Sequence, residues 1–290
     1  MNNSLVILTP LYNDWGSLKI LIKNIKKLNL QKKITLIIIN DNSAKKSQIL
    51  FKKDRSIIKI EIINLKENCG SQRAIAIGLN YLKIKKYNSP IIIIDSDGED
   101  NPNLIKKMLE YHKKYKNYII TINRTFRTEN FLIKILYELN IFFTILLTRK
   151  FIRFGNYSLI PNKIISKMNV SRDFWFSYPS AISNNYNNII RIYAKKEIRY
   201  SGKSQMNYYQ LIFHSLRIIS TFKKRIFFNT LIYLTLIILF FMNNKTIIII
   251  SLFSFFLINI FFLYLYKFIL RSEPDNYLCK IKNTKVINLI

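Results

Sequence analysis

The chain has 290 residues and a formal net charge of +30, from 46 Lys and Arg against 16 Asp and Glu. The length fits one large domain or two small ones, and the charge is compatible with nucleic acid or an anionic membrane surface as partner. The Lys residues are spread over many predicted helices without a recognition motif, so nucleic-acid binding is the least favoured class. Ile, Lys and Asn are abundant throughout, so part of the charge reflects overall composition.

Cysteine usage and the N-terminus both favour a cytoplasmic location for the first part of the chain. Cys69 and Cys279 form no metal-binding or redox pattern, which is compatible with a reducing compartment. The first predicted strand begins within a few residues of Met1, without a basic region followed by a small-residue cleavage site. We therefore expect no secretory signal peptide.

Short apolar runs alternate with helical stretches through the first part of the chain. The β-branched runs are continuous rather than alternating with polar residues, which is typical of strands covered on both faces. This order predicts an α/β fold with a mostly parallel, Rossmann-like sheet and right-handed crossovers. Strands are predicted at residues 5–9, 34–40, 57–64, 91–94 and 118–122, and helices at about 15–28, 45–55, 71–84 and 102–115.

The C-terminal third contains two long, nearly uncharged apolar stretches, residues 226–242 and 246–266. Each approaches or reaches the roughly 20 residues with which a helix spans a bilayer. Their short connection predicts an antiparallel transmembrane hairpin over residues 226–267, which would anchor a domain formed by residues 1–205. Basic residues flank the hairpin, so the positive-inside rule places both of its ends and the tail, residues 268–290, in the cytoplasm. These flanking residues are Lys223, Lys224, Arg225, Lys267 and Arg271.

Two further segments have the composition of interfacial helices. Residues 130–150 are strongly apolar but contain Lys134, Glu138 and Asn140, which argues against a membrane span. Residues 206–225 are amphipathic and end in the basic cluster before the hairpin. Such helices can lie in the headgroup plane, with their cations on anionic lipid. Ordinary packing within the domain is the alternative for both.

Polar residues gather just beyond the ends of the predicted strands. Asp95-Ser96-Asp97 directly follows the apolar run of residues 91–94. Two carboxylates one residue apart can share Mg²⁺ or Mn²⁺, and that cation can hold a pyrophosphate, because hard oxygen ligands suit these metals. A plain turn is the alternative, since Asp-Ser-Asp-Gly is favourable turn sequence in any protein. Ligands of parallel sheets bind at these strand ends, which also carry Tyr12, Asp14, Asp41 and Asn68.

Four sequence motifs follow one another at the strand ends, and together they resemble a known family. They are Thr9-Pro10-Leu11-Tyr12-Asn13-Asp14, Asn40-Asp41-Asn42-Ser43, Asn68-Cys69-Gly70 with Ala74 and Gly78, and Asp95-Ser96-Asp97 with Pro102. In order, they resemble the Pro-x-Tyr-Asn-Glu, Asp-Asp-Gly-Ser, Asn-x-Gly-x-x-x-Ala-x-x-x-Gly and Asp-x-Asp motifs of family 2 glycosyltransferases. The resemblance covers roughly residues 5–205 and implies a GT-A fold. With the hairpin, it extends to the membrane-anchored branch of dolichyl-phosphate mannose synthase and undecaprenyl-phosphate glucosyl- and aminoarabinosyl-transferases.

The resemblance implies a site for a nucleotide-sugar donor, either a UDP- or a GDP-sugar. Pro10, Tyr12 and Asp14 are expected to frame the base and ribose, and Asp41 to accept a hydrogen bond from the base. Gly70 allows the backbone to pass close to the ligand at the start of a helix, whose N-terminal amides favour anions. Packing of Tyr12 and a simple turn at Gly70 are the structural alternatives.

The same resemblance assigns the metal and the catalytic machinery. Asp95 and Asp97, with Ser96 between them, are expected to bind the donor and to hold the Mg²⁺ or Mn²⁺ that neutralises the departing diphosphate, and Asp97 is a catalytic candidate. Arginine suits phosphate oxygens, so basic residues near the site are candidates for the donor diphosphate or an acceptor phosphate. Solvated charge on a basic chain is the alternative for these residues, which are Arg124, Arg127, Arg199 and Lys203.

The acceptor decides between two mechanisms. A lipid monophosphate is largely anionic near pH 7, its second pKa being about 6, and needs no general base. A sugar hydroxyl needs one, and Asp173 lies about where hydroxyl-using relatives place it, although it could instead cap a helix or loop. The preferred hypothesis is inverting transfer to polyprenyl (undecaprenyl) phosphate at the cytoplasmic membrane face.

Other hypotheses stay open at this stage. One alternative keeps the fold and transfers the sugar to a hydroxyl of a lipid-linked or cell-surface glycan. A membrane-associated binding protein without catalysis is disfavoured, because Asp41, Asp95 and Asp97 are retained. The identity of the sugar, the nucleotide and the oligomeric state are open, and a homo-oligomer is compatible with the sequence.

Overall fold

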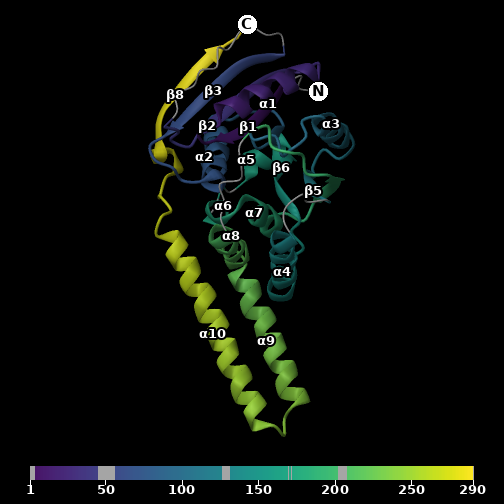
Figure 1. Cartoon of the computed structure of the whole chain (residues 1–290), viewed down its shortest axis with the longest axis vertical. Coiled ribbons are helices and arrows are strands. Elements are labelled where there is room, and N and C mark those ends of the chain that lie inside the picture. Colours follow the sequence, from purple (N-terminus) through teal and green to yellow (C-terminus); the bar gives the residue numbers. More distant parts are fainter. Residues whose placement is uncertain are drawn as a thin grey trace.

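The computed structural model describes residues 4–44, 56–125, 131–168, 170, 172–201 and 208–289. A sheet with flanking helices lies at one end of the molecule, and two long helices project from it side by side (Figure 1). The predicted helix over residues 45–55 falls outside the described residues.

One mixed sheet organises the domain. Its eight described strands have the order β7-β5-β6-β4-β1-β2-β3-β8. The strands are β1 (Ser4–Leu11), β2 (Lys33–Asn40), β3 (Ile57–Leu65), β4 (Ile91–Ile93), β5 (Ile119–Arg124), β6 (Phe154–Ile160), β7 (Ile189–Ala194) and β8 (Ile281–Asn288).

The pairing of the strands confirms an α/β fold with a mostly parallel sheet. β1 pairs in parallel with β2 and β4, β2 with β3, and β5 with β7. β6 runs antiparallel between β4 and β5, and β8 runs antiparallel to β3. The parallel arrangement places the carboxyl ends of β1, β2, β3 and β4 at one edge of the sheet, where the motifs lie.

Helices cover both faces of the sheet. Alternate residues of β1 point to opposite faces: Leu5 and Ile7 belong to one apolar cluster with α1 and α3, whereas Val6 and Leu8 belong to another with α2, α6 and α7. The helices of this domain are α1 (Trp15–Lys27), α2 (Ser71–Ile84), α3 (Leu104–Lys114), α5 (Asn162–Lys167), α6 (Arg172–Phe176) and α7 (Tyr178–Asn185).

The predicted apolar and amphipathic segments form four helices below the sheet in Figure 1. α9 and α10 run antiparallel, and the Nδ2 atom of Asn259 on α10 donates a hydrogen bond to Oγ1 of Thr230 on α9 at 2.9 Å. α4 lies beside α9, where the Nδ2 atom of Asn229 donates to the carbonyl oxygen of Leu147 at 2.9 Å. The helices are α4 (Phe131–Thr148), α8 (Tyr208–Ser220), α9 (Lys223–Phe240) and α10 (Lys245–Leu270).

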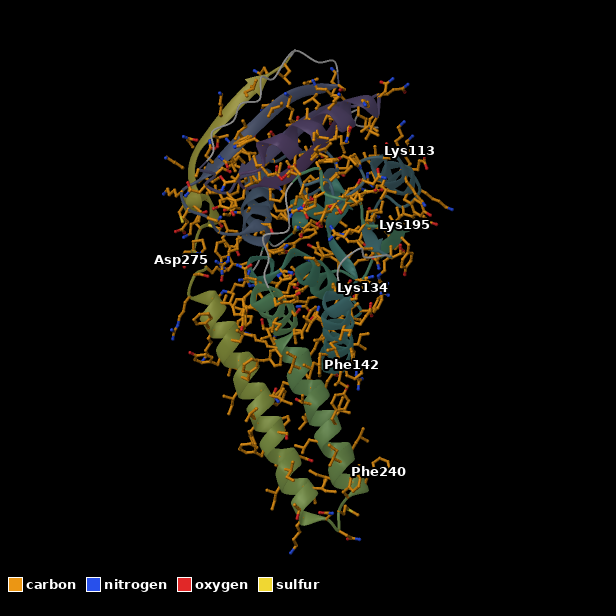
Figure 2. The ribbon with its side chains drawn as sticks, in the orientation of Figure 1. Lys113, Lys134, Phe142, Lys195, Phe240 and Asp275 are labelled. Atoms are coloured by element: carbon orange, nitrogen blue, oxygen red, sulfur yellow. The ribbon has the colours of Figure 1, made fainter. Side chains whose placement is uncertain are left out.

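Within the described residues, α10 is long and apolar enough to cross a membrane. α9 begins with Lys223-Lys224-Arg225, so its first turn is strongly basic. Apolar side chains extend outward along these helices, including Phe142 on α4 and Phe240 on α9 (Figure 2). The structure therefore has one helix with the properties of a membrane span, next to a second helix with a charged start.

The C-terminal segment, assigned from the sequence only as a tail, returns to the sheet. After α10 the chain forms a short 3-10 helix, η1 (Tyr277–Lys280), and then β8. β8 pairs with β3 from Leu65–Ile281 to Lys59–Asn288. The pair of long helices, α9 and α10, therefore lies in the chain between two strands of the sheet, with β7 before it and β8 after it.

Candidate functional site

Asp41 fixes the loop that precedes α2. Its Oδ1 and Oδ2 atoms accept hydrogen bonds from the backbone N–H groups of Cys69 at 2.7 Å and Gly70 at 2.8 Å. Gly70 has φ +86°, a conformation that residues with a side chain rarely adopt. Burial raises the pKa of Asp41, while the two N–H groups act in the opposite direction. The carboxylate that was predicted to bind the base thus shapes the backbone around the expected nucleotide position.

The ends of β1, β2 and β4 are joined by hydrogen bonds. The hydroxyl group of Ser96 donates to the carbonyl oxygen of Pro10 at 3.1 Å, and the backbone N–H of Asn13 donates to Oγ of Ser43 at 2.8 Å. Tyr12, between them in the sequence, is 41% exposed. An exposed aromatic ring on a fixed loop offers a surface on which a ligand could stack, and its expected role in framing the base and ribose stays a prediction.

Asp14 begins α1. Its Oδ1 atom accepts a hydrogen bond from the backbone N–H of Ser17 at 3.2 Å, which is an N-cap contact. The hydroxyl group of Ser201 also donates to this oxygen at 3.3 Å. In this structure Asp14 therefore caps the helix and contacts the segment after β7.

Asp95 is a buried carboxylate among other acids. Burial, followed by the neighbouring Asp100 and Asp97, raises its pKa to about 7. The Nδ2 atom of Asn156 on β6 donates to Oδ1 and Oδ2 of Asp95 at 3.0 and 3.2 Å. The side chain of Gln72 on α2 donates in turn to Oδ1 of Asn156 at 2.9 Å. A chain of amides thus connects Asp95 to the first turn of α2.

Asp97 contacts the segment that follows β7. Its Oδ2 atom forms an ion pair with Nη2 of Arg199 at 2.7 Å, and its Oδ1 atom accepts a hydrogen bond from the backbone N–H of Glu99 at 3.0 Å. The backbone N–H of Tyr200 donates to the carbonyl oxygen of Asp97 at 2.9 Å. Arg199 was predicted to bind phosphate, and the structure places it beside a predicted metal ligand.

The remaining acids of this loop are paired with cations. Arg124 contacts Asp100 at 3.0 Å and Glu99 at 3.4 Å, and Lys196 contacts Glu99 at 3.0 Å. Burial lowers the pKa of Arg124, but the carboxylates outweigh this effect and raise it above its usual value. Arg124 therefore serves here to neutralise the acidic loop of residues 95–100.

The donor atoms of this loop fit a cation shared with a diphosphate. Within the described part of the chain, no three His, Cys, Asp or Glu side chains are grouped as a metal site. Asp95 and Asp97 offer two hard oxygen ligands, so diphosphate oxygens and water would complete the shell. Burial, followed by the neighbouring Asp100 and Asp97, raises the pKa of Asp95, so a divalent cation bound there would favour its charged form and relieve the repulsion between the acids.

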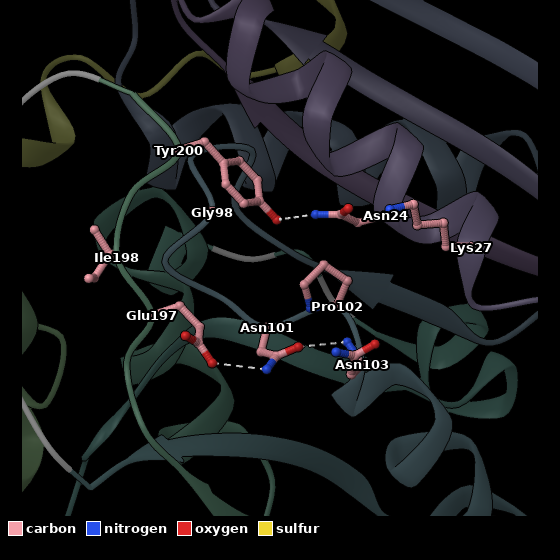
Figure 3. A pocket seen from close by; sticks show the side chains of 9 residues that line it. All are labelled: Asn24, Lys27, Gly98, Asn101, Pro102, Asn103, Glu197, Ile198 and Tyr200. Carbon is pink, nitrogen blue, oxygen red and sulfur yellow. Dashed lines mark hydrogen bonds between the residues drawn. The ribbon is translucent and has the colours of Figure 1, made fainter.

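A cavity of about 430 Å³ is lined by α1, by the acidic loop with the residues that follow it, and by the segment after β7 (Figure 3). The Nδ2 atom of Asn24 donates to Oη of Tyr200 at 2.9 Å, and that of Asn101 donates to Oε1 of Glu197 at 2.9 Å. The ring of Tyr200 also packs over Gly98. These contacts hold the segment after β7 across the acidic loop.

The other predicted site residues lie apart from this group or outside the described residues. Oδ2 of Asp173 on α6 accepts hydrogen bonds from the Nδ2 atoms of Asn184 and Asn185 on α7, at 3.1 and 3.2 Å. No contact found among the described residues joins Asp173 to Asp95 or Asp97. Arg127 and Lys203 lie outside the described residues.

Three residues at the site were not found from the sequence. Asp100 could have been suspected, since it belongs to the same acidic run as Asp95 and Asp97. Gln72 and Asn156 had no such signal, because neutral amides are common and β6 was not predicted. Their role depends on the antiparallel strand that brings Asn156 to Asp95.

Comparisons with known proteins agree with this geometry. Residues 6–168, more than half of the chain, match the family described as Glycosyl transferase family 2. The uncharacterized glycosyltransferase YkcC of Bacillus subtilis is 29% identical over 129 residues, 43% of this chain and 38% of that protein. The uncharacterized glycosyltransferase sll0501 of Synechocystis is 22% identical over 227 residues, 73% of this chain and 67% of that protein.

A solved structure shows the same fold. Glucosyl-3-phosphoglycerate synthase from Mycobacterium tuberculosis, in complex with Mn²⁺, UDP-glucose and phosphoglyceric acid, has a TM-score of 0.52 and 11% identity. The similarity covers 77% of this chain and 79% of that one. This similarity of fold agrees with the family match over residues 6–168 and with the acidic loop at the end of β4. The chain belongs to glycosyl transferase family 2, and its α/β sheet is GT-A-like.

Proposed function

We propose that the chain is a metal-dependent, inverting glycosyltransferase. It transfers a sugar from a nucleotide-diphosphate sugar to polyprenyl (undecaprenyl) phosphate at the cytoplasmic face of the membrane. The observation that carries the proposal is the carboxylate pair Asp95 and Asp97 at the carboxyl edge of the sheet, in a chain that also contains the apolar helix α10.

The donor follows from the strand ends. The exposed ring of Tyr12 offers a stacking surface for a base, and Asp41 holds the Gly70 loop in a shape that a ligand can approach closely. A solved relative of the same fold carries UDP-glucose and Mn²⁺, which supports a nucleotide sugar and a divalent cation here. Bound at Asp95 and Asp97, the cation would neutralise charge on the leaving diphosphate.

The reaction is a single in-line displacement. An oxygen of the acceptor phosphate forms a bond to the anomeric carbon on the face opposite the diphosphate. The bond between that carbon and the diphosphate oxygen breaks, and the nucleoside diphosphate leaves with the electron pair. Arg199, which forms an ion pair with Asp97, would bind the departing phosphate oxygens, since guanidinium groups suit them. No residue has to remove a proton, because the acceptor is already anionic.

The membrane location rests on α10 and its neighbours. We propose that α9 and α10 span the membrane as a hairpin, with α4 and α8 at the interface and the sheet and both ends of the hairpin in the cytoplasm. The basic start of α9 and the exposed apolar side chains along α4 support this arrangement.

The hydroxyl alternative depends on a general base, for which Asp173 was the candidate. Its Oδ2 atom is occupied by the amides of Asn184 and Asn185, which favours a role in connecting α6 to α7. An Asp173→Asn variant is expected to keep its transfer rate within a few-fold of the parent. A loss of order 10² or more would instead support a base and a hydroxyl acceptor.

Product analysis tests the proposal. Membranes containing the full chain are incubated with a panel of labelled UDP- and GDP-sugars, with and without undecaprenyl phosphate. We expect one label to become lipid-extractable only when the lipid is present, and Asp95→Asn to reduce this by about 10²-fold or more. Asp275→Asn, a change at an exposed acid (labelled in Figure 2), is the matched control. If every donor fails with the parent chain, the proposal is wrong.

A further inference from the structure

Two arginines combine an unpartnered buried Nε atom with the lack of a carboxylate partner among the described residues. Arg73 on α2 and Arg217 on α8 each have a buried Nε atom without a hydrogen-bond partner. Within the described part of the chain, no carboxylate forms an ion pair with either guanidinium group. Both side chains are half-buried, and removing a charge from water is costly unless it is paired. Carboxylates do contact the guanidinium groups of Arg124, Arg153, Arg172 and Arg199.

Arg73 is held in place by neutral groups. Its Nη2 atom donates to Oγ of Ser272 at 2.8 Å, and its Cζ atom lies 4.9 Å from the centre of the Trp175 ring. The Nε1 atom of Trp175 donates to the same Ser272 oxygen at 3.3 Å. These contacts orient the guanidinium group, while the carboxylates of Asp41 and Glu67 favour its charged form without forming an ion pair with it.

Arg217 approaches from the helix next to the apolar hairpin. Its Cζ atom lies 5.3 Å from the centre of the Phe213 ring. Burial, followed by the positive charge of Arg73, lowers the pKa of Arg217 to about 10. The positive charge of Arg73 thus disfavours the charged form of Arg217. A bound anion would offset this effect and satisfy the buried donors.

A cavity of about 370 Å³ lies at this position. Arg73, Trp175, Arg271 and Lys280 line it, together with the Asn68–Cys69 loop. Three of its lining charges are already balanced: Lys280 is paired with Glu67, and Glu273 contacts Arg172, outside the lining, at 3.5 Å. Arg73 and the exposed Arg271 have no ion-pair partner among the residues that the structure describes. The cavity thus has an excess of positive charge.

The cavity lies between the end of α10 and the expected donor site. Arg271 directly follows α10, so a group held there would be close to the membrane end of the domain. On the other side, the cavity is lined by Cys69, whose backbone N–H binds Asp41. Gln72, next to Arg73, donates a hydrogen bond to Asn156, which in turn donates to Asp95. An anion in this cavity would stand between a lipid surface and the metal-binding loop.

We infer that the cavity lined by Arg73 and Arg271 binds a phosphate monoester, namely the phosphate group of the lipid acceptor. The inference rests on the proposed function and names the residues that hold its second substrate. It also explains why the segment after α10 returns to the sheet: Ser272 orients Arg73, and Arg271 contributes a charge. The sequence did not identify Arg73, Arg271 or the segment after α10 as candidates for phosphate binding.

Fluorescence of Trp175 reports on this cavity directly. The chain has two tryptophans, so a Trp15→Phe variant of the full chain leaves Trp175 as the only one. In detergent, it is titrated with farnesyl monophosphate, with farnesol and with inorganic phosphate. We expect a saturable change with farnesyl monophosphate, the same change at higher concentration with inorganic phosphate, and none with farnesol.

Variants identify the residues. Arg73→Gln is expected to raise the half-saturating concentration of farnesyl monophosphate at least about tenfold, since it loses a charge-assisted contact. Arg271→Gln tests the cavity without altering a buried group, and the same direction is expected. Arg225→Gln, which removes an exposed charge at the start of α9, is the matched control and is expected to leave the value unchanged.

Several outcomes would overturn the inference. They are no saturable binding, equal binding of farnesol, or equal affinity in Arg271→Gln and the parent. Displacement of farnesyl monophosphate by UDP at equal concentration would assign the cavity to the donor instead. If labelled sugar is transferred to undecaprenyl phosphate but binding is independent of these arginines, only the inference fails. If phosphate binds through them but no sugar reaches the lipid, the proposed function fails.

Discussion

Buried carboxylates stand at the ends and centre of the parallel strands, and each is compensated in a different way. Two backbone N–H groups bind Asp41, and two tyrosine hydroxyls and a lysine bind Glu61. Among the described residues, the carboxylate of Asp95 accepts hydrogen bonds from the amide of Asn156 and is favoured by the charge of Arg124, with no ion pair of its own. The least compensated of the three is the one at the predicted metal site, as expected if a ligand cation completes its environment.

Replacing Asp41 by Asn tests the loop at Gly70. The amide retains one acceptor but turns an N–H donor toward a backbone N–H donor, so one of the two hydrogen bonds is lost. We expect the free energy of unfolding to fall by roughly 1–3 kcal/mol and the KM for the nucleotide sugar to rise. Denaturant titration and donor kinetics measure the two effects. Unchanged values of both would show that Asp41 does not shape this loop.

Glu61 provides a prediction for acid stability. Burial raises its pKa, but Lys59, Tyr87 and Tyr81 together outweigh burial and lower it below the ordinary value. A carboxyl group whose pKa is lower in the folded state stabilises the fold above its unfolded pKa of about 4.3. This stabilisation disappears as the pH falls through the folded-state pKa. The melting temperature of the parent should therefore fall more steeply between pH 5 and pH 3 than that of Glu61→Gln. Parallel curves would contradict this account.

Single residues were predictable from sequence where a motif defined them. Asp41, Gly70 and the Asp95–Asp97 pair lie at the strand ends, as expected. The partner of Asp97 was not predictable, because Arg199 is 102 positions away, and only the crossing of the segment after β7 brings it to the loop. Arg73 was also missed, since its neighbours Trp175 and Ser272 come from distant parts of the chain.

At the scale of elements, the segment after β7 packs against the acidic loop. Tyr200 packs on Gly98, which has φ +93°. A Cβ atom at Gly98 would lie 2.6 Å from the Tyr200 ring. Gly98→Ala is thus expected to displace Tyr200 and to cost about 1 kcal/mol or more of stability. Gly16→Ala, where a Cβ atom meets nothing within 4 Å, is the control. Equal melting temperatures of the two variants would exclude the proposed packing.

Strands with a continuous apolar run and helices with apolar residues at helical spacing were predicted well. Strands whose sequences contain many polar residues were not. β1 to β5 and α1 to α4 lie close to their predicted ranges. β6 carries Asn156 and Ser158 on its buried length, and β8 is largely exposed along a polar sequence. Neither has the apolar run that identifies a strand, and their pairing depends on neighbours rather than on local sequence.

At the scale of the whole molecule, the chain leaves the sheet through α8, passes along α9 and α10, and returns as β8. Ending the chain after residue 276 would remove η1 and β8, exposing the edge of β3. We expect this variant to remain in the membrane pellet after carbonate extraction but to lose at least about 2 kcal/mol of stability through its missing strand hydrogen bonds. Unchanged stability would mean that the return to the sheet is dispensable.

The central claim is that the sugar is attached to a phosphate monoester. The lipid product formed by the full chain is purified and examined by mass spectrometry and by ³¹P spectroscopy. The account predicts the mass of undecaprenyl phosphate plus one sugar residue, with its single phosphorus converted from a monoester to a diester. A product whose phosphate stays a monoester while a hydroxyl group carries the sugar would contradict it.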